Sequence, residues 1–322
     1  MNNRPPKISV IMSVYNGEKY ISQAIESILN QTFKDFEFII INDTSTDKSL
    51  NIIKSFKDSR IKIINNPQNI GLTKSLNLAL KQAQGKYIIR MDADDISHKN
   101  RFKEQYKFMK KNPDISIAGS FMNIINEKGK IISINKVYTS FKIIKFILLF
   151  KNCILHSSII ARLKDIKKIG FYNEKYKYTQ DLDLYSRAVN KNLKIVIIPK
   201  ILVSSRIHQE TISKKPESNK IQKYNRQKIC INNINKYMNL SSKEKNILER
   251  SLWNQKITSL KELITSYNLI KKLKREFIKK EHPNHQEIKQ INYETRKRTS
   301  GFWGFYLKNS HPKLYKTLKL IK

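Results

Sequence analysis

Residues 85–95, Gly-Lys-Tyr-Ile-Ile-Arg-Met-Asp-Ala-Asp-Asp, place an acidic cluster directly after a run of apolar residues. The run Tyr87–Met91 predicts a short buried strand. Carboxylates crowded at the end of a strand raise each other's pKa unless a cation keeps them ionised. Hard oxygen ligands suit Mg²⁺ or Mn²⁺, which complete their coordination with substrate phosphates and water. The stretch therefore predicts a metal site for a phosphate-bearing substrate or, taken alone, a solvated acidic turn that caps the next helix.

Strand-like and helix-like runs alternate on the N-terminal side of this cluster. Alternation at this spacing predicts βαβ units and a mostly parallel sheet that is covered on both faces. The expected strands are residues 8–14, 36–41, 61–64 and 87–91, and the expected helices are residues 18–31, 46–56 and 72–82.

Polar clusters follow three of these strands. Ser13 to Asn16 follow the first strand, Asn42 and Asp43 the second, and Asp92 to Asp95 the fourth. Ligands of parallel α/β sheets bind beyond the carboxyl ends of the strands. We therefore expect the three clusters to lie at one edge of one sheet.

The rest of the chain is divided into two parts. Residues 101–111 read as a helix, 115–125 as a strand and 141–150 as a short apolar helix, and this middle section is expected to complete the sheet and build the acceptor side. Helical periodicity dominates from about residue 215. We predict a catalytic domain at residues 5–214 and a helical, basic C-terminal region at residues 215–322.

The net charge of +37 is the extreme feature of the composition. Residues 215–322 contain 26 Lys and Arg against eight Glu and no Asp. Such a balance indicates attraction to a polyanion or an anionic membrane. A general enrichment in Lys, Asn and Ile is the alternative explanation. No nucleic-acid-binding motif is recognised, and the acidic clusters would repel phosphate in the absence of metal, so nucleic acid is not expected as a partner.

Cysteine content and hydropathy bear on the compartment. Cys153 and Cys230 have neither disulfide-framework nor zinc-site spacing, which favours a reducing compartment. The N-terminus lacks the apolar stretch of a signal peptide, and the longest apolar run is far short of the roughly 20 residues of a membrane span. We expect a cytoplasmic protein, and a peripheral position on the inner face of the plasma membrane stays open.

Six blocks together resemble the family 2 glycosyltransferases with the GT-A fold. They are PKISVIMSVYN at 6–16, AIESILNQTFKDF at 24–36, IINDTSTD at 40–47, NIGLTKSLN at 69–77, GKYIIRMDADD at 85–95 and QDLDLYSR at 180–187. The resemblance covers about residues 5–214, and its order and spacing agree with the family. It implies a GT-A nucleotide-sugar-binding fold of the α/β class, and it does not extend to the C-terminal third.

The resemblance also implies site residues. Asp43 would accept a hydrogen bond from the nucleotide base, and Asp92 would contact the ribose or a metal-bound water. Asp94 would bind the metal directly, His208 would join the metal or diphosphate shell, and Asp95 would support them. The predicted nucleotide-binding residues are Ser13, Tyr15, Asp43, Lys74 and Asp92.

Asp181 occupies the position of the family's catalytic carboxylate. It precedes a predicted helix start, where the helix dipole keeps a carboxylate ionised and ready to accept a proton. Asp183 is the competing candidate. For Asp43 and Asp181 the structural alternative is a plain cap, and for His208 it is a buried structural histidine. His156 and Gly170 align with recurring family positions. The resemblance implies that His156 lines the acceptor pocket and that Gly170 forms a turn before the base.

Four positions depart from the family pattern, and one of them is Lys99, which stands where Pro is common. Asn42 replaces the first Asp of the nucleotide motif, Thr44 replaces a Gly, and Gln180 replaces the Glu that commonly precedes the base. Glycine permits positive φ at little cost, so Thr44 is expected to alter its loop.

The reaction implied is a single displacement that inverts configuration at the anomeric carbon. A base would activate the acceptor hydroxyl, and Mg²⁺ or Mn²⁺ would offset the charge of the departing diphosphate. We predict an enzyme that transfers a sugar from a nucleotide sugar, with UDP favoured, to a saccharide or lipid-linked acceptor in bacterial surface polysaccharide or glycolipid synthesis. The alternative is a catalytically inactive nucleotide-sugar-binding module. A sugar nucleotidyltransferase is disfavoured, because Ser13–Gly17 lacks the glycines of a phosphate loop.

The C-terminal tail carries an aromatic cluster, Phe302, Trp303, Phe305 and Tyr306, ahead of several lysines. Aromatic and basic residues together are typical of an anionic membrane interface. Packing of these aromatics on the catalytic core or on a second subunit is the alternative. The lysines are Lys308, Lys313, Lys316, Lys319 and Lys322.

Overall fold

The computed structural model describes residues 4–209, 216–254 and 256–313. The chain divides into two compact units, one of residues 1–141 and 153–222 and one of residues 142–152 and 223–322. The first unit contains the sheet and every candidate site residue. The second unit is helical. The domain boundary at residues 214 and 215 stays a prediction.

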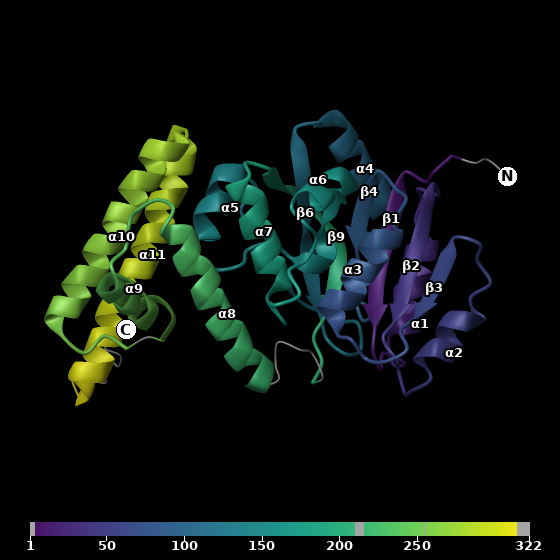
Figure 1. Ribbon diagram of the computed structural model, residues 1–322, viewed down its shortest axis with the longest axis horizontal. Helices are drawn as coiled ribbons and strands as arrows, with labels where there is room; N and C mark the ends of the chain where they lie inside the picture. Colours follow the sequence, from purple (N-terminus) through teal and green to yellow (C-terminus); the bar gives the residue numbers. More distant parts are fainter. Residues whose placement is uncertain (1–3, 210–215, 255, 314–322) are drawn as a thin grey trace. The chain divides into compact units, whose positions relative to one another are not determined.

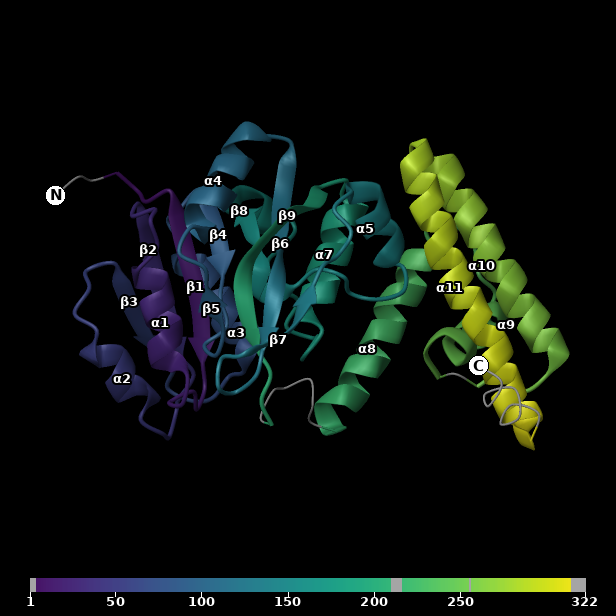
Figure 2. The ribbon, with the colours of Figure 1, turned by 180° about the vertical axis from the view of Figure 1, so that it is seen from behind.

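The first unit is built on one mixed, mostly parallel sheet (Figures 1 and 2). Its strand order is β3-β2-β1-β4-β8-β6-β9-β5, and β7 pairs with β6 beside this path. The strands are β1 (Ile8–Val14), β2 (Phe36–Asn42), β3 (Ile61–Asn65), β4 (Tyr87–Arg90), β5 (Ile96–Ser97), β6 (Ile115–Ile125), β7 (Ile131–Asn135), β8 (Ile160–Arg162) and β9 (Lys194–Arg206).

Strand register brings the polar clusters to one edge, as predicted. β1 pairs in parallel with both β2 and β4, and β2 pairs in parallel with β3. Val14 lies opposite Asn42, and Ile11 lies opposite Arg90. The segments that follow β1, β2 and β4 therefore leave the sheet from the same edge.

Helices cover both faces of this sheet. The α1 and α2 side chains pack with Ile8, Val10 and Met12 in one core cluster. The helix α3 contacts β1 and β2 from the opposite face, which is visible on comparing Figures 1 and 2. The helices of the unit are α1 (Ile21–Leu29), α2 (Ser49–Ser55), α3 (Leu72–Gln82), α4 (Arg101–Lys111), η1 (His156–Ser158), α6 (Leu163–Lys168) and α7 (Gln180–Asn190).

The first helix begins later than residue 18, where the periodicity placed it. The carbonyl of Gly17 accepts hydrogen bonds from the backbone of Tyr20 and Ile21. Just before this turn, the Glu18 N–H donates to Asp47 at 2.9 Å. Residues 16–18 are thus bound to the segment after β2 and belong to the functional edge instead of the helix.

The second unit consists of helices, which confirms a helical C-terminal part. Phe146 of α5 packs against Phe277 of α10 with ring centroids 5.0 Å apart, and the buried Lys145 pairs with Glu281 at 2.8 Å. The helices are α5 (Phe141–Ile147), the part of α8 (Pro216–Ile234) that follows residue 222, α9 (Ser242–Glu249), the π-helical η3 (Arg250–Asn254), α10 (Leu260–Glu281) and α11 (His285–Ser310). No helix within the described ranges is long and apolar enough to cross a bilayer.

The aromatic cluster of the tail lies within α11 and divides between core and surface. Phe302 is 1% exposed and belongs to the core of its unit, whereas Trp303 is 53% exposed. Phe302 is therefore a core residue of the helical unit. Contact of the aromatic cluster with a membrane, with the catalytic core or with a second subunit stays a prediction. Lys316, Lys319 and Lys322 lie outside the described residues.

A buried carboxylate fastens the opposite edge of the sheet. Glu37 of β2 accepts hydrogen bonds from Ser9 Oγ of β1 at 2.6 Å and from the Gln84 N–H at 2.8 Å. Its second oxygen pairs with Lys62 of β3 at 2.7 Å. Burial alone would raise the pKa of Glu37, but the hydrogen bonds from Lys62, Ser9 and Gln84 lower it below its usual range. Glu37 therefore holds three strands and the turn before β4 together.

We expect Glu37→Gln to lower the free energy of unfolding by about 1–2 kcal/mol at neutral pH, because charge-assisted hydrogen bonds are lost. A carboxylate with a lowered pKa stabilises the fold above its unfolded pKa, and this stability is lost as the pH falls through the folded pKa. The difference from wild type should therefore shrink between about pH 7 and about pH 3 in urea unfolding. Glu26→Gln, at an exposed position of α1, is the control. A difference that does not change with pH would contradict this account.

Candidate active site

Asp43 organises the loops on the nucleotide side of the sheet edge. It is 2% exposed, and its carboxylate accepts hydrogen bonds from Asn66 Nδ2 at 2.7 Å, from the Ile70 N–H at 2.9 Å and from the Gly71 N–H at 2.8 Å. A carboxylate offers about four acceptor positions. Asp43 therefore shapes the loop before α3, and its contact to a nucleotide base stays a prediction.

The departures from the family motif at residues 42 and 44 are accommodated locally. Thr44 adopts a positive φ of 61°, the conformation that glycine would take more readily. Its hydroxyl donates to the carbonyl of Asn66 at 3.0 Å. The Asn42 side chain accepts from the Ser45 N–H and donates to Asn65, both at 3.2 Å. Side-chain hydrogen bonds thus hold the turn that a glycine would allow.

The other nucleotide-side residues differ in exposure. Ser13 at the end of β1 is partly buried, Tyr15 is 54% exposed, and Lys74 lies exposed in the first turn of α3. Ser13 and Tyr15 lie at the end of β1 and just after it, and Lys74 follows the loop held by Asp43. Their predicted contacts to a nucleotide stay predictions.

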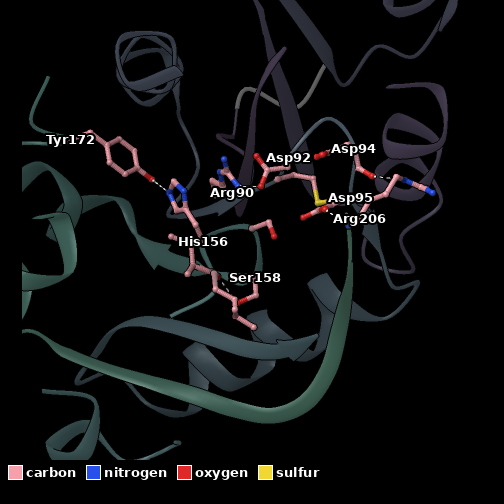
Figure 3. Close-up of polar contacts among 12 residues, drawn as sticks. Arg90, Asp92, Asp94, Asp95, His156, Ser158, Tyr172 and Arg206 are labelled. Carbon is pink, nitrogen blue, oxygen red and sulfur yellow. Dashed lines mark hydrogen bonds and ion pairs between the residues drawn. The ribbon is translucent and has the colours of Figure 1, made fainter. Parts of the chain in front are cut away.

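The acidic loop after β4 is held on one side by Arg90 (Figure 3). Arg90 is 3% exposed and forms an ion pair with Asp92. The fully buried Arg101 donates to the carbonyls of Arg90 and Ser157, at 3.0 and 2.7 Å. The guanidinium of Arg101 therefore joins the end of β4 to the η1 turn, and the guanidinium of Arg90 holds Asp92.

Asp94 faces His208 across the loop. The Asp94 Oδ2 and His208 Nε2 atoms are 2.9 Å apart, and the imidazole lies against the ring of Tyr20. Burial and the charge of Asp92 raise the pKa of Asp94, while His208 lowers it. The family resemblance placed both residues in the metal shell, and the structure brings them into contact.

Asp95 lies at the bottom of the loop. Burial, together with the charges of Asp92 and Asp94, raises the pKa of Asp95 to about 7. Its Oδ1 accepts from the Arg206 N–H at 2.9 Å. Within the part of the chain that the structure describes, the buried Oδ2 has no hydrogen-bond partner.

Arg206 of β9 joins three segments of the edge. Its guanidinium donates to the carbonyl of Asp94 at 3.0 Å, to Glu127 O at 2.9 Å in the β6–β7 turn, and to Gln23 of α1 at 2.9 Å. It also lies over the ring of Tyr20 at 4.5 Å. The acidic loop is therefore held between Arg90 and Arg206, as Figure 3 shows.

The residues present fit a divalent cation that is shared with a ligand. Among residues 4–209, 216–254 and 256–313, no cluster of three or more His, Cys, Asp or Glu could by itself hold a metal ion. Asp94 and His208 supply two donors in contact, and Asp95 supplies an unsatisfied buried oxygen nearby. Mg²⁺ and its chemical relatives commonly bind through one or two carboxylates and substrate phosphates. This donor set suits such an ion.

Asp181 lies in the first turn of α7, so the predicted helix start is confirmed. Its Oδ1 accepts from the Leu182 N–H at 2.8 Å. Burial raises the pKa of Asp181, Arg90 lowers it and Asp92 raises it, which places Asp181 within electrostatic reach of that ion pair. By contrast, Asp183 pairs with Arg187 at 2.7 Å on the same helix.

His156 lies beside Tyr172 and Tyr185 in a buried cluster. Its Nε2 is 2.8 Å from the Tyr172 hydroxyl, and burial together with the charge of Arg90 keeps the pKa of His156 well below its usual range. Asn77 of α3 fixes Tyr172 by bonding both its N–H and its carbonyl, at 3.0 and 2.9 Å. The cluster presents a neutral imidazole and a phenol near Arg90.

Sequence reasoning missed Arg90, Arg206 and Tyr172. A signal was present for both arginines, because Arg90 interrupts the apolar run before the acidic cluster and Arg206 stands two residues before His208. Buried charges are paired or hydrogen-bonded, so an arginine in a buried strand indicates a nearby acceptor. Tyr172 carried no signal beyond its position after Gly170, whose positive φ of 82° confirms a turn there.

Comparisons with known proteins show which family the chain resembles. Residues 9–170 match the family described as "Glycosyl transferase family 2". The chain is 40% identical to an uncharacterized glycosyltransferase of Methanocaldococcus jannaschii over 63% of this chain and 71% of the relative. It is 36% identical to one of Haemophilus influenzae over 73% and 75%. It is also 36% identical to the O-antigen biosynthesis glycosyltransferase WbnJ of Escherichia coli over 64% and 82%.

Solved structures show the fold. S. aureus TarS 1–349 in complex with UDP-GlcNAc aligns with a TM-score of 0.62 at 20% identity, covering 94% of this chain and 91% of that one. A Pyrobaculum calidifontis mannosyltransferase in complex with GDP-Man and Mn²⁺ aligns with a TM-score of 0.55 at 11% identity, covering 97% and 89%. The predicted GT-A fold class is confirmed.

The role of Arg206 generates a prediction about the acidic loop. A lysine cannot reproduce the fork that reaches Asp94, Glu127 and Gln23 together. We expect Arg206→Lys to weaken Mn²⁺-dependent binding of UDP by at least about tenfold in calorimetric titration, since each tenfold is 1.4 kcal/mol. Arg60→Lys, which alters the Asp58 pair before β3, should leave binding unchanged. Wild-type affinity of Arg206→Lys would show that the loop does not need this clamp.

Proposed function

The chain belongs to glycosyltransferase family 2, and we propose that it transfers a sugar from a UDP-sugar to an acceptor hydroxyl with inversion at the anomeric carbon. The observation that supports this proposal most strongly is the acidic loop after β4. In that loop Asp94 contacts His208, Arg90 holds Asp92, and Asp181 lies within reach of the Arg90–Asp92 pair. These contacts support a leaving-group side at the acidic loop and a base side at Asp181, within electrostatic reach of the Arg90–Asp92 pair.

Asp181 is proposed as the general base. Its carboxylate takes the proton of the acceptor hydroxyl while the acceptor oxygen bonds to the anomeric carbon, and the bond from that carbon to the diphosphate breaks to release UDP. A single displacement of this kind inverts configuration. Burial raises the pKa of Asp181, which strengthens its carboxylate as a base. Asp183 is engaged by Arg187, which favours Asp181 for this role.

Asp94 and His208 are proposed to hold Mg²⁺ or Mn²⁺, with Asp92 oriented toward the ribose or a metal-bound water. Bound there, the ion would stabilise negative charge on the departing diphosphate. Arg90 and Arg206 orient the acidic loop, and the Asp43 loop, with Ser13, Tyr15 and Lys74 around it, is proposed to receive the nucleotide.

The relatives support a donor and a pathway class. TarS is described in complex with UDP and with UDP-GlcNAc, and WbnJ acts in O-antigen biosynthesis. We therefore favour UDP as the carrier and a saccharide or lipid-linked acceptor of bacterial surface polysaccharide or glycolipid synthesis. A lipid-linked acceptor requires access to a membrane surface, to which the net charge of +37 would be attracted when the lipids are anionic. We propose a cytoplasmic protein that is peripheral on the inner leaflet.

Asp181→Asn should bind the UDP-sugar within about twofold of wild type but lose at least about a hundredfold in turnover. Because the base must be ionised, kcat/KM should fall as the pH drops through the raised pKa of Asp181, above the ordinary aspartate value of about 3.9. The measurement is UDP release across pH, with Asp183→Asn as the matched control. If Asp183→Asn lost turnover and Asp181→Asn did not, the base would be misassigned.

Asp94→Ala should abolish metal-dependent turnover while thermal unfolding stays close to wild type, because the loss removes several kcal/mol of transition-state stabilisation. Asp114→Ala, at an exposed surface pair with Lys194, should keep full activity. The assay measures UDP release from a panel of UDP-sugars with Mn²⁺, with Mg²⁺ and with EDTA. Full turnover in EDTA would overturn the metal assignment, and donor binding without UDP release for any acceptor would favour the inactive binding module.

A further inference from the structure

The β6–β7 hairpin exposes an apolar edge. Ile131, Ile132 and Ile134 of β7 are 54%, 56% and 51% exposed. β7 lies beside the main path of the sheet and pairs with β6. Single exposed apolar residues are ordinary on protein surfaces, whereas three large ones in four positions form a patch that indicates an interaction site.

Lysines surround the three isoleucines. Lys128 and Lys130 precede them, Lys136 follows them, and all three lysines are exposed. The single acidic residue of segment 126–136 is Glu127, which pairs with Lys19 at 2.6 Å. The segment therefore presents apolar side chains between cations that carry no local counter-charge of their own.

The turn of this hairpin is ordered and is fastened to the candidate active site. Asn126 accepts hydrogen bonds from the N–H groups of Lys128 and Lys130, both at 3.0 Å. Arg206, whose side chain holds the Asp94 carbonyl, also donates to the carbonyls of Asn126 and Glu127, at 3.2 and 2.9 Å. A binding partner of the hairpin would thus lie beside the acidic loop.

We propose that the β7 edge, Ile131–Ile134 with Lys128, Lys130 and Lys136, docks on the surface of an anionic lipid bilayer. Isoleucines can enter the interface while the flanking lysines contact lipid headgroups. The position of the hairpin beside the acidic loop would bring a lipid-linked acceptor hydroxyl to the base. That orientation rests on the proposed function, whereas the docking itself does not depend on turnover.

The bulge in β7, its flanking lysines and the net charge of the chain disfavour binding of this edge to another strand or to a second copy of the chain. The pairing of β6 with β7 shifts register between Ile124 and Ile125, so that Ile132 is an extra residue in a bulge. Bulges and lysines are devices that discourage edge-to-edge pairing of strands. A second copy would also bring together two chains of net charge +37.

The test is flotation of the full chain with vesicles, without donor or acceptor. We expect wild type to float with phosphatidylserine-containing vesicles at low salt and to remain unbound with pure phosphatidylcholine vesicles. The variant Ile131→Ser/Ile132→Ser/Ile134→Ser should partition at least about tenfold more weakly, given the burial energy of three isoleucines. Lys128→Ser/Lys130→Ser/Lys136→Ser should weaken the binding and reduce its salt dependence.

The matched control is Leu260→Ser/Ile264→Ser/Tyr293→Ser, because these residues of α10 and α11 are 50%, 51% and 59% exposed. It should float like wild type, and every variant should bind UDP like wild type, which separates docking from the proposed catalytic function. Unchanged flotation of both hairpin variants, or loss only in the control, would overturn the proposal. So would absence of wild-type flotation, or a wild-type dimer in sedimentation that the isoleucine variant dissociates.

Discussion

The crowding of Asp92, Asp94 and Asp95 at the end of β4 is the constraint on which the rest of the site depends. Burial and mutual repulsion raise the pKa of Asp94 and Asp95, so the loop is costly to keep ionised without cations. Arg90 and Arg206 hold it from its two sides, one through an ion pair and one through backbone hydrogen bonds. The proposed divalent cation would offset the negative charge that remains on this loop.

The parallel sheet makes this arrangement possible because the two ends of its strands have different roles. At one edge Glu37 joins β1, β2 and β3 through buried hydrogen bonds and an ion pair. At the other edge the chain tolerates conformations that a purely structural loop would avoid, including the positive φ of Thr44. Asp43 offsets that irregularity by holding the loop before α3 through backbone N–H groups. The edge held by Glu37 therefore permits the irregular edge at which we propose that the nucleotide binds.

The sequence predicted the limits of helices and strands better than the contacts between side chains of distant residues. The limits of α4 and β6 follow directly from periodicity, and the shared edge follows from parallel pairing. The Asp94–His208 contact was reachable through resemblance to the family, since 114 residues separate them. The hydrogen bonds of Arg206 could not be predicted from the sequence. The carbonyls that its guanidinium reaches are determined by the pairing of β9 in the sheet. Periodicity likewise could not separate the buried Phe302 from the exposed Trp303.

The most direct test of this account is anomalous diffraction at the manganese edge from crystals grown with UDP and Mn²⁺. The account predicts one strong anomalous peak bonded to Asp94 and in contact with the diphosphate, with His208 in its shell and Asp181 across the open side. A diphosphate bound at the Asp43 loop with no manganese beside Asp94, or with the metal held by other residues, would contradict it.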